Sequence, residues 1–258
     1  MKALLMRLSA PMQAWGTQSR FSERDTQLEP SKSGVIGLLG AALGLPRTAD
    51  FTDLAGLAMA VRVDREGRKM RDFHTVGGGT PPLEFCQRHG MKRARYGVSK
   101  ANGDVPEPAI SNRYYLADAR FLVALGGSSP SDEALLQRLA TALAAPVHPL
   151  FLGRKSFVPA EPVLHDPKQP LRSGDSLREI LEREPWDAGD RLALSPRAWS
   201  KHPERLRLVL ESPSLDEGAP RADVPVSFEK GRRRFITRHV VVCFIPTPIS
   251  ATHEENAA

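Results

Sequence analysis

A long stretch of this sequence without a charged or histidine residue runs from Ser33 to Pro46, directly after Ser31 and Lys32. It falls short of the roughly 20 apolar residues that a membrane-spanning helix needs, so we expect no membrane partner. Its apolar side chains lie nearly all round a helical projection, which is typical of a buried helix. We therefore expect a core helix that Ser31 or Ser33 caps and that ends at Leu45-Pro46.

The start of this helix is a candidate phosphate site. Backbone N–H groups and a partial positive charge at a helix N-terminus favour anions, and Lys32 adds a full charge. No glycine precedes Lys32 at the spacing of the Walker A loop, so we do not expect an ATP site. We take Lys32 and Ser33 as candidate phosphate ligands; the alternative is a capped helix that binds nothing.

Hydrophobic periodicity predicts the order of the remaining elements. We expect strands at 3–8, 57–65 and 119–125, a helix at 131–145 capped by Ser131, and an extended piece at 147–152. The strand at 57–65 alternates and is expected to be half-buried, with Arg62 and Asp64 on its polar side. The order is part of the β-α-β-β-α-β plan of ferredoxin-like and RNA-recognition domains, with an insertion between the middle strands. The predicted fold class is α+β, with this domain over residues 1–152.

The pattern changes after residue 152. Six prolines interrupt residues 159–196, around a short helix at 175–184, and strands are predicted at 205–211 and 235–245. We expect a smaller, strand-rich region at 153–248 and a disordered tail at 249–258.

Charge and composition narrow the class of partner. Lys and Arg outnumber Asp and Glu by 36 to 30, which gives a net charge of +6 and suits a polyanion. Cys86 and Cys243 lie far apart and the histidines show no ligand spacing, so we expect no metal and no cofactor. Arg7 and Pro11 interrupt the first apolar stretch, which argues against a signal peptide and for a cytoplasmic protein.

The excursion at 75–111 is the most informative segment for function. Loops of this length usually serve a function, and no acidic residue lies between Arg88 and Lys100. Basic residues beside tyrosines offer phosphate contacts and stacking faces for bases. The alternative is a surface hairpin with solvated charges. The candidate residues of the segment are Arg88, Lys92, Arg93, Arg95, Tyr96 and Lys100, followed by Arg113 and Tyr114.

Two further basic clusters follow, and catalytic patterns are few. Arg154 and Lys155 come directly after Gly153, whose turn can bring backbone N–H groups to a phosphate. The role of the cluster Lys230–Arg234 stays open. Trp15 is a candidate stacking residue, with core packing as the alternative. His74 and His202 are possible acid–base groups, but we assign no catalytic residue.

Five segments, in this order, resemble the CasD family of the type I-E CRISPR Cascade complex, within the RAMP superfamily: RLSAPMQAWG, PSKSGVIGLLGAALG, RDFHTV, YYLADARFLVAL and PLFLGRKS. The resemblance covers residues 1 to about 160. Beyond that it rests on Arg234-Phe235 and the final strand from Arg238.

The resemblance implies a modified RNA-recognition domain with a thumb hairpin at 75–111 and a smaller C-terminal region. It implies a non-catalytic subunit that holds the 5′ handle of the CRISPR RNA and caps the backbone filament, beside the large subunit that reads target DNA. The thumb then contacts RNA or the neighbouring backbone subunit, LGRKS is a glycine-rich loop, and Arg113 matches an arginine near the handle. The alternative is a metal-independent endoribonuclease. A related type I-C family cleaves precursor RNA with a tyrosine, a lysine and a histidine, but no segment here matches that arrangement.

Overall fold

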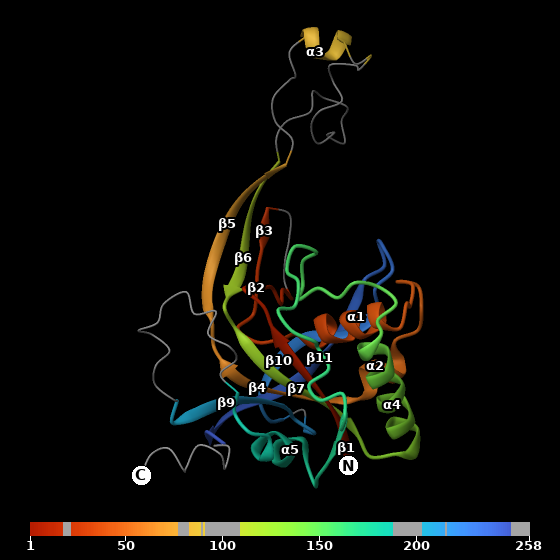
Figure 1. Cartoon of the computed structure of the whole chain (residues 1–258), viewed down its shortest axis with the longest axis vertical. Helices are drawn as coiled ribbons and strands as arrows, with labels where there is room; N and C mark the ends of the chain where they lie inside the picture. Colours follow the sequence, from red (N-terminus) through yellow and green to blue (C-terminus); the bar gives the residue numbers. More distant parts are fainter. Residues whose placement is uncertain are drawn as a thin grey trace.

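A computed structural model of the chain describes residues 1–17, 22–76, 83–88, 90, 109–187, 203–214 and 216–248 (Figure 1). The helices are α1 (Lys32–Ala42), α2 (Thr52–Gly56), α3 (Leu83–Arg88), α4 (Pro130–Ala144) and α5 (Leu177–Arg183). The strands are β1 (Lys2–Ser9), β2 (Met12–Gln13), β3 (Glu23–Arg24), β4 (Ala58–Arg65), β5 (Arg68–Val76), β6 (Ala109–Ala117), β7 (Arg120–Gly127), β8 (Leu171–Ser173), β9 (Arg205–Glu211), β10 (Ala219–Ser227) and β11 (Arg234–Pro246). No helix among these residues is long and apolar enough to cross a membrane.

Within this described part, the main sheet has seven strands in the order β10-β11-β9-β4-β7-β1-β8, and neighbouring strands run antiparallel. Helices α1 and α4 pack on one face, and α5 packs on the other. The strands at 3–8, 57–65 and 119–125 are confirmed as β1, β4 and β7. The predicted α+β class is confirmed at the level of a mixed fold with an antiparallel sheet and few helices.

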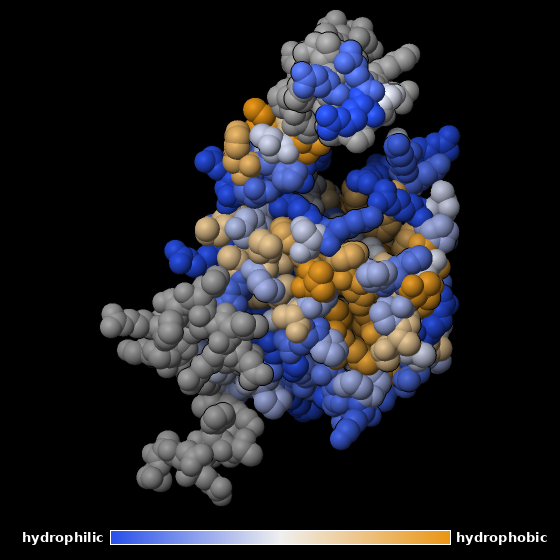
Figure 2. Space-filling view, turned by 45° about the horizontal axis from the view of Figure 1, so that its top comes forward, coloured by the Kyte–Doolittle hydropathy of each residue, from blue (hydrophilic) through white to orange (hydrophobic). Residues whose placement is uncertain are grey.

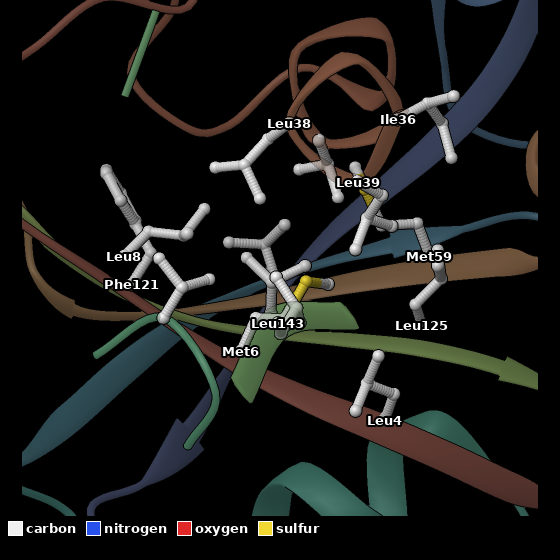
Figure 3. Packing of buried hydrophobic residues seen from close by; sticks show 14 of the residues in the cluster. Leu4, Met6, Leu8, Ile36, Leu38, Leu39, Met59, Phe121, Leu125 and Leu143 are labelled. Carbon is white, nitrogen blue, oxygen red and sulfur yellow. The ribbon is translucent and has the colours of Figure 1, made fainter. Parts of the chain in front are cut away.

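The larger core lies between α1, α4 and one face of the sheet (Figure 3). Leu4, Met6 and Leu8 alternate along β1 and point toward the helices, because successive side chains of a strand point to opposite faces. Leu39 of α1 and Leu143 of α4 meet them. This core fixes α1 against the sheet.

Three predictions about elements were wrong. Residues 147–152 form no strand, because the N–H groups of Val147 and His148 bind the carbonyls at the end of α1, 2.9 and 3.2 Å away. Strand β8 instead pairs with β1 at that edge of the sheet. Helix α4 begins one residue earlier than expected, at Pro130, because proline is tolerated at the first helical position. Its cap is Ser129 instead of Ser131, and Asp132 completes a capping box.

The third error concerns β4, which is buried on both faces. Arg62 is 1% exposed and donates to the carboxylate of Asp64 at 2.6 and 3.2 Å. Its guanidinium also donates to the backbone carbonyls of Leu181, Glu184 and Pro185, at the end of α5 and just beyond it. The alternation of apolar and charged residues predicted that one face of this strand is exposed. Both charges can be buried because Arg62 and Asp64 pair with each other and the backbone carbonyls accept the remaining donors of Arg62.

Strands β5 and β6 form a long hairpin that rises away from the main sheet (Figure 1). The predicted excursion at 75–111 therefore starts at the end of β5 and returns along β6, and its described part includes α3. Strand β6 also pairs with β2 and β3 along its other edge. Arg88 lies on α3 and is exposed. Five predicted thumb residues lie outside the described residues: Lys92, Arg93, Arg95, Tyr96 and Lys100.

The C-terminal strands continue the main sheet. Strands β9 and β11 confirm the predictions for 205–211 and 235–245, and α5 confirms the short helix. Strand β10 was not predicted. Because β9 pairs with β4, residues 203–248 extend the sheet of residues 1–127. Residues 249–258 lie outside the described part.

Candidate functional site

The start of α1 already holds an anion that belongs to the chain itself. Ser31 caps the helix and accepts from the N–H of Gly34, and the N–H of Lys32 donates to Asp223 at 2.8 Å. The ammonium of Lys32 is buried and donates to both oxygens of Glu211, at 2.9 and 3.0 Å. Burial lowers the pKa of Lys32, while Glu211 opposes that shift. Because its ammonium is already paired with a carboxylate, we do not keep Lys32 as a candidate phosphate ligand.

Trp15 belongs to the core. It is 2% exposed, and its indole N–H donates to Gln13 at 3.2 Å. Gly34 packs directly on the indole, because a Cβ at this glycine would lie 2.8 Å from the ring. Of the two interpretations of Trp15, the structure favours core packing over stacking on a ligand.

The glycine turn after residue 152 is tightly built. Leu152 accepts a hydrogen bond from the N–H of Ala14 at 3.0 Å, and its own N–H donates to Phe157 at 2.8 Å. Gly153 has φ of +101°, and a Cβ there would lie 2.0 Å from the carbonyl oxygen of Ala14. Only glycine fits this position. The turn thereby sets the place of Arg154.

Arg154 joins the turn to the stem of the β5–β6 hairpin, near the middle of its paired strands. Its guanidinium donates to the carbonyl of Tyr114 at 2.8 Å and to that of Arg24 at 3.4 Å. Partial burial lowers the pKa of Arg154, and the nearby positive charge of Arg113 lowers it further. A guanidinium pKa is so high that the group stays charged. Three arginines therefore lie close together at this point, with Asp72 and Asp25 as partly compensating neighbours.

We call Arg24, Arg113 and Arg154 the arginine cluster. The surroundings of the other predicted residues differ from one to the next. Tyr114 is half-buried, with the ammonium of Lys69 5.0 Å from its ring centre. Lys155 is exposed on the glycine turn. His74 pairs with Asp72 at 3.4 Å on β5. His202 lies outside the described residues.

A hollow of about 450 Å³ opens between α1, the segment 148–153 and the β10–β11 hairpin. Its α1 wall is smooth, because Ser33, Gly34 and Gly37 have small or no side chains. The other walls are aromatic and basic, and no acidic residue is among the described residues that line them. These residues are Phe51, Phe151, Phe228, Phe235, Arg47, His148 and Arg233.

The aromatic wall is packed into a fixed arrangement. The rings of Phe51 and Phe228 meet edge to face at 4.9 Å, and Phe228 and Phe235 lie 6.2 Å apart. Phe235 is 38% exposed, an unusual state for a large apolar ring. On the face that Figure 2 shows, hydrophobic side chains gather on the main body, below the projecting β5–β6 hairpin, and hydrophilic side chains surround them. Such a surface can take a flat apolar group that carries negative charge.

The structure brings together some predicted residues and adds others. Ser33 lines the hollow, and Gly153 lines it next to Arg154, so the hollow adjoins the arginine cluster. Arg233, from the cluster whose role stayed open, lines the same hollow. Arg24, Arg47 and the phenylalanines were missed, because single aromatic or basic residues in separate segments give no pattern in a sequence.

A family model and a curated relative identify the family of this chain. The family described as CRISPR-associated protein (Cas_Cas5) matches residues 3–241. The chain is 31% identical over 194 residues to "CRISPR system Cascade subunit CasD" of Escherichia coli (strain K12), covering 70% of this chain and 77% of that protein.

Two solved structures are similar along almost the whole chain. One, titled "CRISPR RNA-guided surveillance complex", has a TM-score of 0.69 and 36% identity over 97% of this chain and 92% of that one. The other, "Crystal structure of Cas protein", has a TM-score of 0.66 and 37% identity, over 96% and 98%. This protein therefore belongs to the Cas5 family of CRISPR-associated proteins.

Proposed function

We propose that this protein is a cytoplasmic, non-catalytic RNA-binding subunit of a CRISPR surveillance complex. In this proposal it holds the 5′ handle of the CRISPR RNA and caps the backbone filament. Its E. coli relative is a Cascade subunit by name, and a similar structure comes from an RNA-guided surveillance complex. The observation that carries the proposal is the aromatic hollow beside the arginine cluster, without an acidic residue in its described lining.

The chemistry of this face suits single-stranded RNA. Arginines bind phosphate groups without regard to sequence, and aromatic rings stack on unpaired bases. Arg154 and Arg113 lie at the stem of the β5–β6 hairpin and Arg233 lines the hollow beside them, so phosphates can be bound on both sides of a nucleotide base. Lys155, exposed on the glycine turn, adds a further cation.

The strand order supports the finer assignment of the fold. Strands β4-β7-β1-β8 lie side by side, with α1 between β1 and β4 in the chain and α4 between β7 and β8. This is the arrangement of a ferredoxin-like β-α-β-β-α-β domain, with β8 in place of the strand predicted at 147–152. We propose that the β5–β6 hairpin is the thumb inserted into that domain.

The stem of this thumb supports a protein partner. Four apolar side chains on it are at least 43% exposed: Met70, Phe73, Val76 and Ile110. Phe73 and Ile110 share one face of the stem, because Ile110 pairs with Thr75, whereas Met70 and Val76 lie on the opposite face. Exposed apolar groups of this size mark interaction surfaces. We propose that the thumb contacts the adjacent backbone subunit, and that the large subunit and, through it, the target DNA lie beside this protein.

Binding to single-stranded handle RNA should depend strongly on salt. If about four cations contact phosphates, the log–log slope of affinity against salt concentration is expected to be about −3. Arg113→Gln/Arg154→Gln should reduce the size of that slope by roughly 1.4. The matched control is Arg178→Gln/Arg183→Gln on α5, on the opposite face of the sheet. Fluorescence anisotropy titrations at several salt concentrations would measure the slope for both double variants. Equal slopes would contradict the proposal that Arg113 and Arg154 bind phosphates.

The non-catalytic assignment has a separate test. The purified protein is incubated with repeat RNA in EDTA, and products are separated on a denaturing gel. We expect no sequence-specific cleavage, because the imidazole of His74 is paired with Asp72 and no segment matches the tyrosine, lysine and histidine arrangement of the type I-C family. Cleavage that is lost in His74→Ala or His202→Ala would establish the endoribonuclease alternative instead.

A further inference from the structure

Four charged side chains join the start of α1 to the C-terminal strands. Asp223 of β10 accepts from the N–H of Lys32 and, through both oxygens, from Arg238 of β11 at 2.7 and 3.0 Å. Glu211 of β9 accepts from the ammonium of Lys32 and from the N–H of Met59 on β4. Arg238 lies 3.6 Å from Glu211. We call Lys32, Glu211, Asp223 and Arg238 the buried clamp.

A local irregularity of β10 aims Asp223 at the helix. The register of β10 against β11 shifts between Arg221 and Val224, where three steps on one strand oppose two on the other. Such a bulge bends a strand and re-aims a side chain. Asp223 sits in this bulge and is 2% exposed. Its contact with the helix N–H therefore fixes how closely β10 approaches α1.

The same two elements form opposite walls of the hollow. Strand β10 leads directly to Phe228, and β11 begins with Arg234 and Phe235, whereas Gly34 and Gly37 belong to α1. The ring of Phe228 would lie 3.9 Å from a Cβ at Gly37. A small rotation of the hairpin about its base would close or widen this gap.

We infer that the buried clamp positions the β10–β11 hairpin against α1 and so sets the width of the hollow before RNA binds. This inference rests on the proposed function. The clamp residues do not contact RNA; they act through Phe228, Arg233 and Phe235. A ligand binds more weakly when only a small fraction of the protein has the binding-competent arrangement. Walls that are held in place before binding keep this fraction high, so less free energy is spent on ordering the site.

The test uses variants that remove the clamp without leaving a buried charge unpaired. Asp223→Ala/Arg238→Met should melt within about 4 °C of the wild type, because a buried ion pair replaced by apolar groups is often neutral for stability. We expect its RNA affinity to fall about tenfold with an unchanged salt slope, because no phosphate-binding cation is removed. Hydrogen exchange at residues 224–236 should become faster.

Two further variants separate positioning from general stability. Asp223→Asn/Arg238→Met keeps an oxygen that accepts from the N–H of Lys32, and it should recover most of the affinity and the slow exchange. Arg62→Met/Asp64→Leu removes a buried arginine–aspartate pair on the other face of β4, and it should change neither measurement at the hairpin.

Each outcome decides the inference. Wild-type exchange at 224–236 in Asp223→Ala/Arg238→Met, or wild-type RNA affinity in that variant, would overturn it. An equal loss of affinity in the control pair would also overturn it, by showing a general effect of stability. If the wild-type chain binds no RNA, the proposed function is wrong, and hydrogen exchange alone then decides whether the clamp holds the hairpin.

Discussion

Replacing Arg62 by alanine is expected to lower the free energy of unfolding by about 3–5 kcal/mol. The reason is the charge left behind: Asp64 is 7% exposed, and its carboxylate would lose the guanidinium that donates to both oxygens. The carbonyls of Leu181 and Pro185 would also lose their donor. Urea denaturation followed by circular dichroism measures the change.

The dependence on pH gives this prediction a second test. Burial raises the pKa of Asp64, and the attraction of Arg62 opposes this rise. In Arg62→Ala the opposing attraction is lost, so the folded state favours the protonated carboxyl more strongly. The folded protein then binds more protons than the unfolded one, so its stability falls as pH rises through the folded-state pKa.

Two measurements decide between this account and a simple cavity effect. Arg62→Ala should be relatively more stable near pH 5 than near pH 8, compared with the wild type. Arg62→Met/Asp64→Leu should recover most of the stability and lose this pH dependence, because no buried carboxylate remains. A loss of stability that is the same at both pH values would point to packing alone.

Replacing Gly153 by alanine is expected to cost roughly 3 kcal/mol of stability and to weaken RNA binding. The added Cβ would lie 2.0 Å from the carbonyl oxygen of Ala14, so the turn must move. Arg154 follows Gly153 directly, and the guanidinium would lose its place beside Tyr114. Thermal denaturation and RNA titration measure the two effects.

Gly231 provides the matched control for Gly153. It also has a positive φ, of +81°, but nothing lies within 4 Å of the position of its Cβ. Gly231→Ala should therefore cost only about 1–2 kcal/mol, the backbone term alone. If both alanine variants lose equal stability and Gly153→Ala binds RNA normally, the turn does not hold Arg154 in the way proposed.

Much of the fold was predictable because its signals are local. Strand β1 and helix α1 each carry an uninterrupted apolar pattern, and the period of that pattern identifies the element. The failure at 147–152 has a different cause. Whether a short extended segment becomes a strand depends on which backbone groups are free to pair with it, and here the end of α1 takes the N–H groups of Val147 and His148.

The candidate site was less predictable because charge in a sequence does not reveal its partners. Lys32 looked free, yet its carboxylate partners Glu211 and Asp223 lie 179 and 191 positions away in the chain. Arg113, Tyr114 and Arg154 could be named as candidates because each lies in a basic or aromatic cluster, and the structure places them side by side. Phe228 and Phe235 were missed, because a phenylalanine that lines a hollow has the same sequence signature as one in the core.

The late position of these partners has a consequence for synthesis on the ribosome. During synthesis, the N-terminal strands of this sheet leave the ribosome long before β9, β10 and β11 have been made. Until Glu211 and Asp223 have been translated, Lys32 has neither of its carboxylate partners. Until Phe228 and Phe235 have been translated, the hollow beside α1 lacks one of its walls. A nascent chain that ends before Glu211 therefore lacks the wall of the hollow that β10 and β11 supply, even where β1, α1, β4 and β7 are already complete. Under the proposed function, RNA can be bound only by the completed polypeptide.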